Sequence, residues 1–279
     1  MASPRIAFLD VDGTILDHGK TIARSTIDAV RSARAAGHYV YLSTGRAAGD
    51  IHPDVLDIGF DGAISNGGAY ATVGDLSVVA NPMPRAAVDE LITYMDAAGI
   101  LYLLQTNAAV YASPHVQKML DDLTRSWMAS HGDEDTPQTA PQEVPRFGDI
   151  ADIDLTQVAK AVFLSDQTDA VERAQADLKD RFHVVAGSMP LPGGSNGEIG
   201  MRGTTKGSAI LSVLTHLAIE PSAAISIGDS WNDVEMFEVC GVGIAMGNAP
   251  AALKQLADEV TTSVRDDGIW NAFRKHGLI

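Results

Sequence analysis

The chain has 279 residues, of which 46% are hydrophobic and 20% are charged, and its mean hydropathy is close to zero. This composition excludes a disordered chain, a collagen-like repeat and a disulfide-stabilised miniprotein, and the length predicts about two domains. The 36 acidic residues outnumber the 20 Lys and Arg residues and give a net charge of −16. Because such a chain repels a phosphate backbone, we expect no nucleic-acid partner.

The only cysteine is Cys240, so we expect no internal disulfide and no thiolate metal cluster. The first apolar run, at residues 6–9, reaches Asp10 too soon to provide the apolar region of a signal peptide. No uninterrupted apolar run approaches the roughly 18 residues that a spanning helix needs. These features predict a cytoplasmic protein without a membrane partner.

Short apolar runs alternate with helical patterns from the beginning of the chain, which predicts a parallel sheet built from strand–helix–strand units. Residues 6–9 read as the first buried strand. A helix is predicted over 25–36, with Ser25 as its N-cap and Gly37 as its left-handed C-terminal residue. The elements predicted next are strands at 39–43 and 63–65 and a hairpin between residues 70 and 80 with its turn at Gly74 and Asp75.

Two stretches rich in proline delimit a middle block. The first is Asn81-Pro82-Met83-Pro84, and the second contains Pro190, Pro192, Gly193 and Gly194. The elements predicted between them are a helix at 85–98 ended by Gly99, strands at 100–105 and 109–112, a helix at 115–130, an exposed loop at 131–154, a strand at 160–164, a helix at 169–180 and a strand at 182–186.

The alternating pattern resumes after the second linker, with a strand at 197–201, a helix at 206–217 and a strand at 223–227. A linker on each side of the middle block predicts that one domain is inserted into another. The fold class is therefore α/β, with an outer domain made from both ends of the chain.

The stretch from Asp10 to Thr14 follows the first strand, at the carboxyl end of the predicted sheet, where open parallel sheets bind ligands. Two carboxylates two residues apart can face the same cleft because successive side chains alternate along a strand. Their mutual repulsion favours a bound cation such as Mg²⁺, or one protonated member. The dipeptide Asp12-Gly13 is also typical of a simple turn.

Two further stretches could hold phosphate. Thr44 and Gly45 follow the second strand, where a hydroxyl and free backbone N–H groups can bind phosphate oxygens, although a helix N-cap explains them as well. Lys206 opens a predicted helix, where its charge opposes the helix dipole unless an anion offsets it. A surface lysine is the alternative interpretation.

A fourth stretch, at 228–233, places Asp229, Asn232 and Asp233 directly after the strand at 223–227. Packing gives no reason for two carboxylates and an amide to gather at the end of a buried strand. This cluster therefore favours a functional site more strongly than the other stretches do.

The four stretches read DVDGT at 10–14, STGR at 43–46, TKGSA at 205–209 and GDSWNDVEMF at 228–237, and AMGNA follows at 245–249. In this order the chain resembles the haloacid dehalogenase-like phosphohydrolases, specifically the Cof-type subfamily with a large α/β cap. The resemblance covers nearly the whole chain, although the middle block matches in layout more than in motif. It implies a doubly wound, mostly parallel Rossmann-like core sheet, formed by residues 1–82 and 193–279, with an inserted α/β cap domain at 83–192.

The resemblance also implies roles for the acidic residues. Asp10 would attack the phosphoryl group and become an aspartyl phosphate. Asp12 would act as general acid and base, and its backbone carbonyl would join the metal shell. Asp229 would complete the Mg²⁺ shell with Asp10, and Asp233 would orient the metal-bound water or Lys206.

Thr44, the backbone of Gly45, Lys206 and Asn232 would surround the phosphoryl oxygens, over which a loose transition state spreads its charge. Two positions depart from the family pattern. Ser230 stands where the family often has Gly or another small residue, and Gly68 stands where Ala is frequent, but neither departure removes a functional group.

The function that this resemblance implies is a Mg²⁺-dependent phosphatase acting on a small phosphorylated metabolite, as a monomer or homodimer. Sugar phosphates, nucleotides, pyridoxal phosphate and flavin mononucleotide all remain open as substrates, because the cap loops that select the leaving group carry no motif. One alternative is a phosphotransferase or phosphomutase, similar to phosphomannomutase, that uses the same aspartyl nucleophile. A second is a catalytically silent binding protein that keeps the fold.

Overall fold

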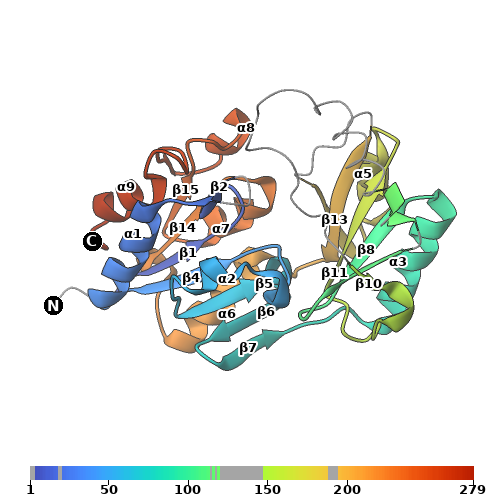
Figure 1. Cartoon of the computed structure of the whole chain (residues 1–279), viewed down its shortest axis with the longest axis horizontal. Coiled ribbons are helices and arrows are strands. Elements are labelled where there is room, and N and C mark those ends of the chain that lie inside the picture. Colours follow the sequence, from blue (N-terminus) through green and yellow to red (C-terminus); the bar gives the residue numbers. More distant parts are fainter. Residues whose placement is uncertain (1–3, 18–20, 114, 117, 120–146, 188–193) are drawn as a thin grey trace, which may run out of the picture.

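The structure is a computed structural model that describes residues 4–17, 21–113, 115–116, 118–119, 147–187 and 194–279. Most of the strands belong to two sheets, one of eight strands and one of six, and helices pack against both (Figure 1). The first strand and the last helix of the chain, at residues 6–9 and 268–275, both lie in the part that contains the eight-stranded sheet (Figure 1). That part is called the core unit below, and the part with the six-stranded sheet is called the second unit.

The core sheet has β1 near its middle. The chain adds β4 and β5 on one side of β1, and later adds β14, β15 and β16 on the other, all parallel to their neighbours. Two antiparallel strands, β6 and β7, complete one edge. The strands in spatial order are β16 (Glu259–Val260), β15 (Val242–Ala245), β14 (Ala224–Gly228), β1 (Ile6–Leu9), β4 (Tyr39–Ser43), β5 (Gly62–Ser65), β6 (Tyr70–Val73) and β7 (Leu76–Ala80).

This order confirms the predicted doubly wound, mostly parallel α/β sheet. The strand order reverses at β1, and the carboxyl ends of β1, β4 and β14 lie side by side at the reversal. Ligands of open α/β sheets bind at such a switch point. The topology therefore sets the place of the site before any side chain is considered.

Helices cover both faces of the core sheet, because the side chains of β1 alternate between two apolar clusters. Ala7 and Leu9 pack into one cluster, with residues of α1 and α9, while Ile6 and Phe8 pack into the other, with residues of α6 and α7. The helices of the core unit are α1 (Arg24–Ala35), α2 (Pro53–Leu56), α6 (Lys206–Leu217), α7 (Val234–Val239), α8 (Ala251–Lys254) and α9 (Gly268–Lys275).

The ends of α1 test two predictions. Gly37 follows the helix with φ +89°, as the C-terminal glycine was expected to do. The predicted N-cap at Ser25 is wrong, because the helix begins at Arg24 and the backbone of Ala23 occupies the N-cap position without a capping side chain. Ser25 is instead the second residue of the helix, inside its first turn.

The second unit has a mainly antiparallel sheet with two helices on one face. The order of its strands is β10 (Gly148–Asp149), β9 (Val110–Ala112), β8 (Leu101–Gln105), β11 (Lys160–Ser165), β13 (Ser195–Met201) and β12 (Phe182–Ala186). The helices are α3 (Arg85–Ala98) and α5 (Ala170–Leu178), and their apolar residues share one cluster with this sheet. A small separate sheet pairs β2 (Leu16–Asp17) with β3 (Thr21–Ile22).

The assignment of the strand at 197–201 to the outer domain is wrong. This strand, β13, lies between β11 and β12 in the six-stranded sheet. The chain returns to the core unit only over residues 202–205, which precede α6. The turn signals at 190–194 therefore mark a connection between two neighbouring strands of the second unit, and the predicted boundary at 192/193 falls too early.

Two other predictions concern the second unit. The helix at 115–130 falls mostly on residues that the structure does not describe, as does the part of the predicted loop at 131–146. The rest of that loop is not purely irregular, because β10 and a short 3₁₀ turn at Ile150–Asp152 occupy it. Among the helices that the structure describes, none has the length and apolar character needed to cross a membrane.

Phe8 anchors one face of the central strand, where it is fully buried against Tyr41 with ring centroids 5.5 Å apart. We expect Phe8→Ala to lower the free energy of unfolding by about 3–5 kcal/mol, because it removes apolar contacts and leaves a cavity. The control is Leu256→Ala, at a side chain that is 54% exposed. This control should change stability by less than about 0.5 kcal/mol in urea unfolding followed by circular dichroism. Equal losses in the two variants would contradict this account of the core.

Candidate active site

The site lies where several strands of the core sheet end. Asp10 directly follows β1, Thr44 follows β4 and Asp229 follows β14. Lys206 begins α6, so its backbone lies at the same edge of the sheet. Residues that are far apart in the sequence are thereby brought to one place by the parallel arrangement of the strands.

Lys206 is the centre of this group. Its ammonium lies 2.6 Å from Asp10 Oδ1, 2.6 Å from Asp233 Oδ1 and 3.2 Å from Asn232 Oδ1. The side chain is only 1% exposed, so the prediction that Lys206 serves a site, rather than the surface, agrees with its position. The helix that carries it is fixed by a capping box between Thr205 and Ser208.

The charges around Lys206 perturb one another strongly. Burial raises the pKa of Asp10 well above its ordinary value, and repulsion from Asp233 and Asp229 adds to this effect, although Lys206 opposes it. Burial alone would lower the pKa of Lys206, but the attraction of Asp10 and Asp233 outweighs it and raises the pKa. Burial, followed by repulsion from Asp233, raises the pKa of Asp229 to about 7. The cluster thus carries more acidic groups than one lysine neutralises.

Asp233 holds the loop that follows β14. Its Oδ2 accepts hydrogen bonds from the backbone N–H groups of Asp229 (2.9 Å) and Ser230 (3.0 Å), while its Oδ1 binds Lys206. Both oxygens of this buried carboxylate are therefore occupied. Its arrangement suits a residue that positions Lys206 and the Asp229 loop.

Three carboxylates could hold a cation. Oxygen atoms of Asp10, Asp229 and Asp233 lie within 4.8 Å of one another. Among the described residues, Oδ2 of Asp10 and Oδ2 of Asp229 accept no hydrogen bond, because Lys206 and Thr14 bind the other oxygen of each carboxylate. A hard divalent cation fits this donor set, since its positive charge would offset the burial and the repulsion that raise the pKa of both groups.

Gly13 makes room for Asp229. A Cβ on Gly13 would lie 2.1 Å from Asp229 Oδ2, and the residue also has φ +89°, which disfavours other residue types. The hydroxyl of Thr14 donates to Asp229 Oδ1 at 3.0 Å. The turn after β1 therefore brings its backbone against the carboxylate from β14, which explains the Gly-Thr pair in the first motif.

Asp12 lies outside the carboxylate group. Arg46 donates to both oxygens of Asp12, with Nε–Oδ2 and Nη2–Oδ1 distances of 2.7 Å. The Asp12 side chain remains 45% exposed. Of the two aspartates in the first motif, Asp10 is therefore buried beside Lys206, whereas Asp12 is partly exposed and paired with Arg46. Arg46 belongs to the STGR motif, but the sequence analysis assigned it no role.

The sequence analysis assigns Thr44, Gly45 and Asn232 to a phosphate cradle, and the structure brings the three residues close together. Thr44 is buried, and its hydroxyl oxygen accepts the N–H of Arg46 at 3.1 Å. Asn232 Oδ1 accepts hydrogen bonds from Lys206 and from the Ser230 hydroxyl. The amide nitrogen of Asn232 lies 3.5 Å from the point where a Cβ on Gly45 would stand. The Thr44 hydroxyl, the Asn232 amide N–H and the Gly45 backbone, which no side chain covers, therefore lie close together.

The two departures from the family pattern have structural reasons. The Ser230 hydroxyl fixes the amide of Asn232, with a 2.7 Å hydrogen bond. Gly68 has φ +109°, and a Cβ there would lie 2.0 Å from the carbonyl oxygen of Thr205. Alanine at this position would press on the backbone immediately before Lys206.

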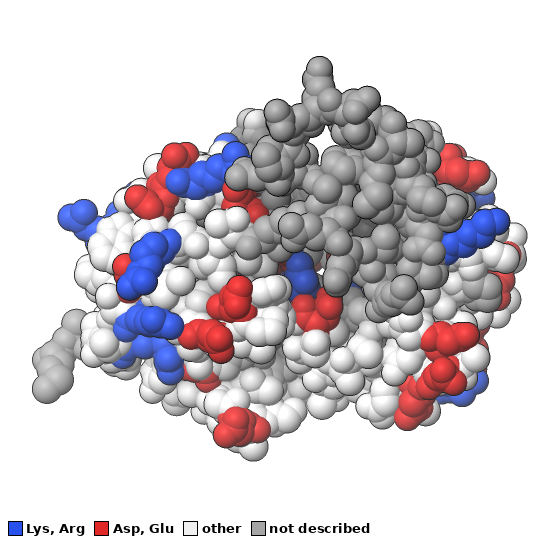
Figure 2. Space-filling view, in the orientation of Figure 1, with Lys and Arg blue, Asp and Glu red and all other residues white. Residues whose placement is uncertain are grey.

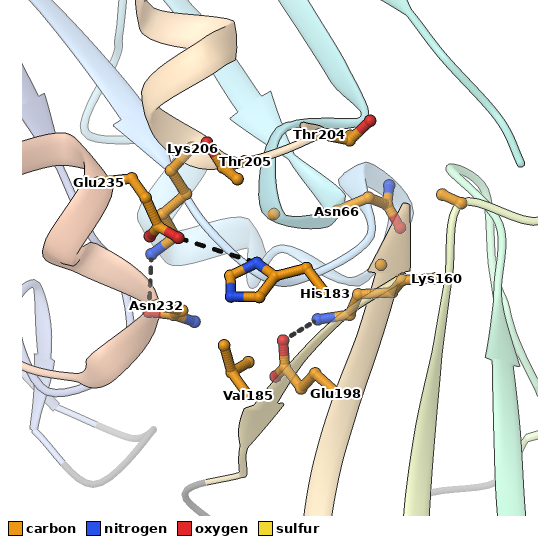
Figure 3. A pocket seen from close by; sticks show the side chains of 13 residues that line it. Asn66, Lys160, His183, Val185, Glu198, Thr204, Thr205, Lys206, Asn232 and Glu235 are labelled. Atoms are coloured by element: carbon orange, nitrogen blue, oxygen red, sulfur yellow. Dashed lines mark hydrogen bonds and ion pairs between the residues drawn. The ribbon is translucent and has the colours of Figure 1, made fainter. Parts of the chain in front are cut away.

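The second unit reaches the site through polar residues that the sequence analysis did not single out. Gln105 Nε2 donates to the Gly45 carbonyl at 2.9 Å and to Asn66 Oδ1 at 2.7 Å. Lys160 and Glu198 form an ion pair of 2.6 Å close to Gly45 (Figure 3). The available signal was a single lysine within the apolar strand VAKAVFL at 158–164. Such a charge inside a buried strand needs a specific partner.

The charges of the described residues on one face of the molecule are mixed in sign. Figure 2 shows Lys and Arg in small groups interspersed with Asp and Glu, among uncharged residues. The expectation of no nucleic-acid partner remains a prediction from the net charge of −16.

A doubly wound α/β sheet with a buried Asp–Lys–Asp group at its switch point defines an α/β protein with a charged site at the carboxyl edge of its sheet. The family model of haloacid dehalogenase-like hydrolases matches residues 7–273, and the chain therefore belongs to this family.

Individual relatives cover the chain almost completely. YkrA of Bacillus subtilis (strain 168) is 29% identical over 99% of this chain and 98% of its own length. The pyridoxal phosphate phosphatase YbhA of Escherichia coli (strain K12) is 28% identical over 98% of both chains. The solved structure of BT1666 from Bacteroides thetaiotaomicron has a TM-score of 0.78 at 23% identity, over 99% of this chain and 96% of that one, and supports the fold.

Removing the central cation should destabilise the protein. We expect Lys206→Met to lower the free energy of unfolding by about 3–5 kcal/mol, because Asp10 and Asp233 would stay buried without their partner. The control is Lys275→Met, which removes a lysine with a side chain that is 64% exposed and ion-paired to Glu259. It should cost less than about 1 kcal/mol in urea unfolding. A Lys206→Met variant as stable as this control would argue against a buried, charge-balanced cluster.

Proposed function

We propose that the protein is a Mg²⁺-dependent phosphatase that hydrolyses a small phosphorylated metabolite through a phosphorylated Asp10. The observation that carries this proposal is the Asp10 carboxylate, which is buried at the switch point with one oxygen bound by Lys206 and the other without a described partner. A fixed carboxylate with a free oxygen beside a lysine suits nucleophilic attack on a phosphoryl group. Membership of the haloacid dehalogenase-like hydrolases supports the same chemistry.

In the first step, Asp10 Oδ2 attacks phosphorus and the bond to the leaving oxygen breaks. Asp12, which takes up a proton from solvent when it leaves Arg46, gives that proton to the leaving oxygen, which departs as an alcohol. For this step Asp12 exchanges its hydrogen bonds with Arg46 for one with the leaving oxygen. The exposure of the Asp12 side chain, at 45%, is compatible with such a rearrangement.

In the second step, a water attacks phosphorus and releases Asp10. Asp12, now a carboxylate, takes a proton from that water, which restores both residues. Thr44, the Gly45 backbone, Lys206 and Asn232 bind the phosphoryl oxygens in both steps and hold them in place.

Asp10 and Asp229 would hold the Mg²⁺ ion, with the backbone carbonyl of Asp12, and Asp233 would orient this group through Lys206 and the Asp229 loop. When bound, the ion neutralises negative charge on the phosphoryl group and the carboxylates. The free Oδ2 of Asp229, the nearby carboxylate of Asp10 and the raised pKa values of both groups support this assignment.

The substrate class is a small phosphorylated metabolite. YbhA is named a pyridoxal phosphate phosphatase, and YwtE of Bacillus subtilis (strain 168), 27% identical, is named a 5-amino-6-(5-phospho-D-ribitylamino)uracil phosphatase. Both names describe the removal of phosphate from a small molecule. The second unit contributes part of the cavity beside Asn232 and Lys206, so we place the selection of the leaving group there.

Replacement of the nucleophile tests the mechanism. We expect Asp10→Asn to lower phosphate release from p-nitrophenyl phosphate by at least about 10³-fold, because an amide cannot form the acyl phosphate. The variant should still fold, since the amide keeps the shape of the side chain. Asp28→Asn, on the exposed outer side of α1, should retain wild-type activity. Retention of a tenth of the wild-type rate by Asp10→Asn would rule out this nucleophile.

Removal of the metal gives an independent test. Chelation with EDTA should abolish activity, and added Mg²⁺ should restore it. At about 100 times its Kd, Mg²⁺ should stabilise the folded wild type by about 2.7 kcal/mol, because it binds only the assembled carboxylates. The stabilisation, measured as a rise in melting temperature, should vanish in Asp229→Asn and persist in Asp28→Asn. An unchanged response in Asp229→Asn would place the metal elsewhere.

A further inference from the structure

The AMGNA stretch at 245–249 is bonded to both segments that carry the proposed metal ligands. It begins at the end of β15, next to β14 in the core sheet, and the N–H of Met246 donates to the carbonyl of Gly228 at 2.9 Å. Gly228 is the last residue of β14, directly before the acidic loop. Two residues after Met246, Nδ2 of Asn248 donates to the carbonyl of Gly13 at 2.8 Å. One short loop thus joins the end of β14 to the loop after β1.

Gly13 is the residue of the loop after β1 that most needs external support. Glycine has more backbone freedom than any other residue, so the peptide groups on either side of it can rotate unless partners hold them. Here both groups are held, because the N–H of Gly13 donates to the carbonyl of Leu16 at 2.8 Å and its carbonyl accepts from Asn248. Leu16 belongs to the same turn as Gly13, whereas Asn248 comes from a distant part of the chain.

The orientation of these two peptide groups affects the proposed Mg²⁺ site. In a trans peptide the C=O points away from the N–H, so the hydrogen bond of the Gly13 N–H also sets the direction of the Asp12 carbonyl, the proposed backbone ligand. The peptide after Gly13 leads to Thr14, whose hydroxyl donates to Oδ1 of Asp229 at 3.0 Å. A rotation at Gly13 would therefore displace the Asp12 carbonyl and the partner of Asp229 together.

Asn248 is itself fixed by the loop at 261–267. Its Oδ1 accepts the backbone N–H of Val264 at 3.0 Å, which determines which way the amide points. The neighbouring N–H of Gly247 donates to the carbonyl of Thr262 at 3.0 Å, and a Cβ on Gly247 would lie 2.6 Å from the nitrogen of Ser263. The glycine of the motif thus permits a close approach of the two loops, and the asparagine extends that contact to the loop after β1.

Stability alone is a weak reason for this arrangement. Asn248 is exposed, so water competes for its hydrogen bonds and their net contribution to folding is small. Groups that bond the segments carrying metal ligands commonly orient those ligands and raise the affinity for the ion. The place of Asn248, between the loop after β1 and the loop at 261–267, is suited to that task.

We infer that Asn248 is a positioning residue for Mg²⁺. By holding the carbonyl of Gly13, it keeps the Asp12 carbonyl and the Asp229 carboxylate in the arrangement that binds the ion. Asn248 acts through the loop after β1 and is not itself a ligand. This inference rests on the proposed Mg²⁺-dependent function, and it assigns a task to a motif residue that lies outside the carboxylate group.

The test measures Mg²⁺ binding without substrate, by isothermal titration calorimetry with MgCl₂. Asn248→Ala and Asn248→Asp should each raise the Kd for Mg²⁺ by about 10- to 100-fold, because both lose the donor to Gly13. Asn248→Asp is the sharper variant. It keeps the shape of the side chain and an acceptor for Val264, and its added negative charge would by itself attract the ion, so weaker binding cannot come from charge.

The matched control is Asn271→Ala. The side chain of Asn271, in α9, donates to the Thr262 hydroxyl at 2.8 Å and to the Asp266 carbonyl at 3.2 Å, so it supports the loop at 261–267 without bonding Gly13. The Kd of this variant for Mg²⁺ should stay within about 3-fold of the wild type. In the metal-free protein, amide hydrogen exchange in the peptide 10–16 should be faster in Asn248→Ala than in Asn271→Ala.

A Kd in Asn248→Asp within about 3-fold of the wild type would overturn the inference, provided that Asp229→Asn loses the ion. Equal losses in the Asn248 and Asn271 variants would overturn it as well, because the loop at 261–267 as a whole would then be responsible. Unchanged binding in Asp229→Asn would overturn the proposed metal site and the inference together. Phosphate release that survives Asp10→Asn, with Mg²⁺ binding still weakened in Asn248→Asp, would refute the proposed phosphatase mechanism and support the inference.

Discussion

The attraction between Lys206 and the carboxylates of Asp10 and Asp233 is the interaction on which the rest of the site depends. These residues come from α6, from the end of β1 and from the loop after β14, so one buried ammonium joins three segments of the core unit. A buried charge is costly unless partners surround it, and here each partner also constrains a loop. Asp233 binds the N–H groups of Asp229 and Ser230, which transmits the position of Lys206 to the proposed metal ligand. A divalent cation would offset the excess of negative charge that remains, and a phosphate ester, itself an anion, could then bind beside it.

Close approaches of the backbone allow this charge cluster to form. Gly13 lets the first loop lie against Asp229, and Gly68 lets the loop after β5 lie against the carbonyl of Thr205, just before Lys206. In both places the left-handed backbone and the lack of space require glycine independently. The segments beside these loops, after β4, after β14 and at the start of α6, carry the groups that would bind the phosphoryl oxygens. A methyl group added at Gly13 or Gly68 would therefore disturb both the loop and the charged residues beside it.

Many of the helices, strands and site residues could be predicted from the sequence because short-range patterns in the chain specify them. The apolar strand at 6–9, the helix at 206–217 and the glycine after the helix at 85–98 have strong short-range signals, and the motif order indicated which acidic residues belong together. The error at β13 has the opposite cause. Pro and Gly at 190–194 signal a chain reversal, but whether that reversal joins two strands of one sheet or two domains depends on long-range pairing with β11 and β12. Likewise, the N-cap of α1 was misplaced by two residues, at Ser25 instead of Ala23, because an N-cap without a capping side chain leaves no mark in the sequence.

The contribution of the second unit could not be predicted for the same reason. Gln105 and Lys160 are neighbours only through the register of β8 and β11, and they meet Gly45 only because the two units pack together. Their side chains point toward a cradle formed by the other unit, so neither unit has a complete binding cavity by itself. Gln105 also bonds Asn66 and the Gly45 carbonyl, which ties the position of the second sheet to the cradle. The contacts that hold the second sheet against the core unit therefore also bring its polar side chains to the edge of the proposed site.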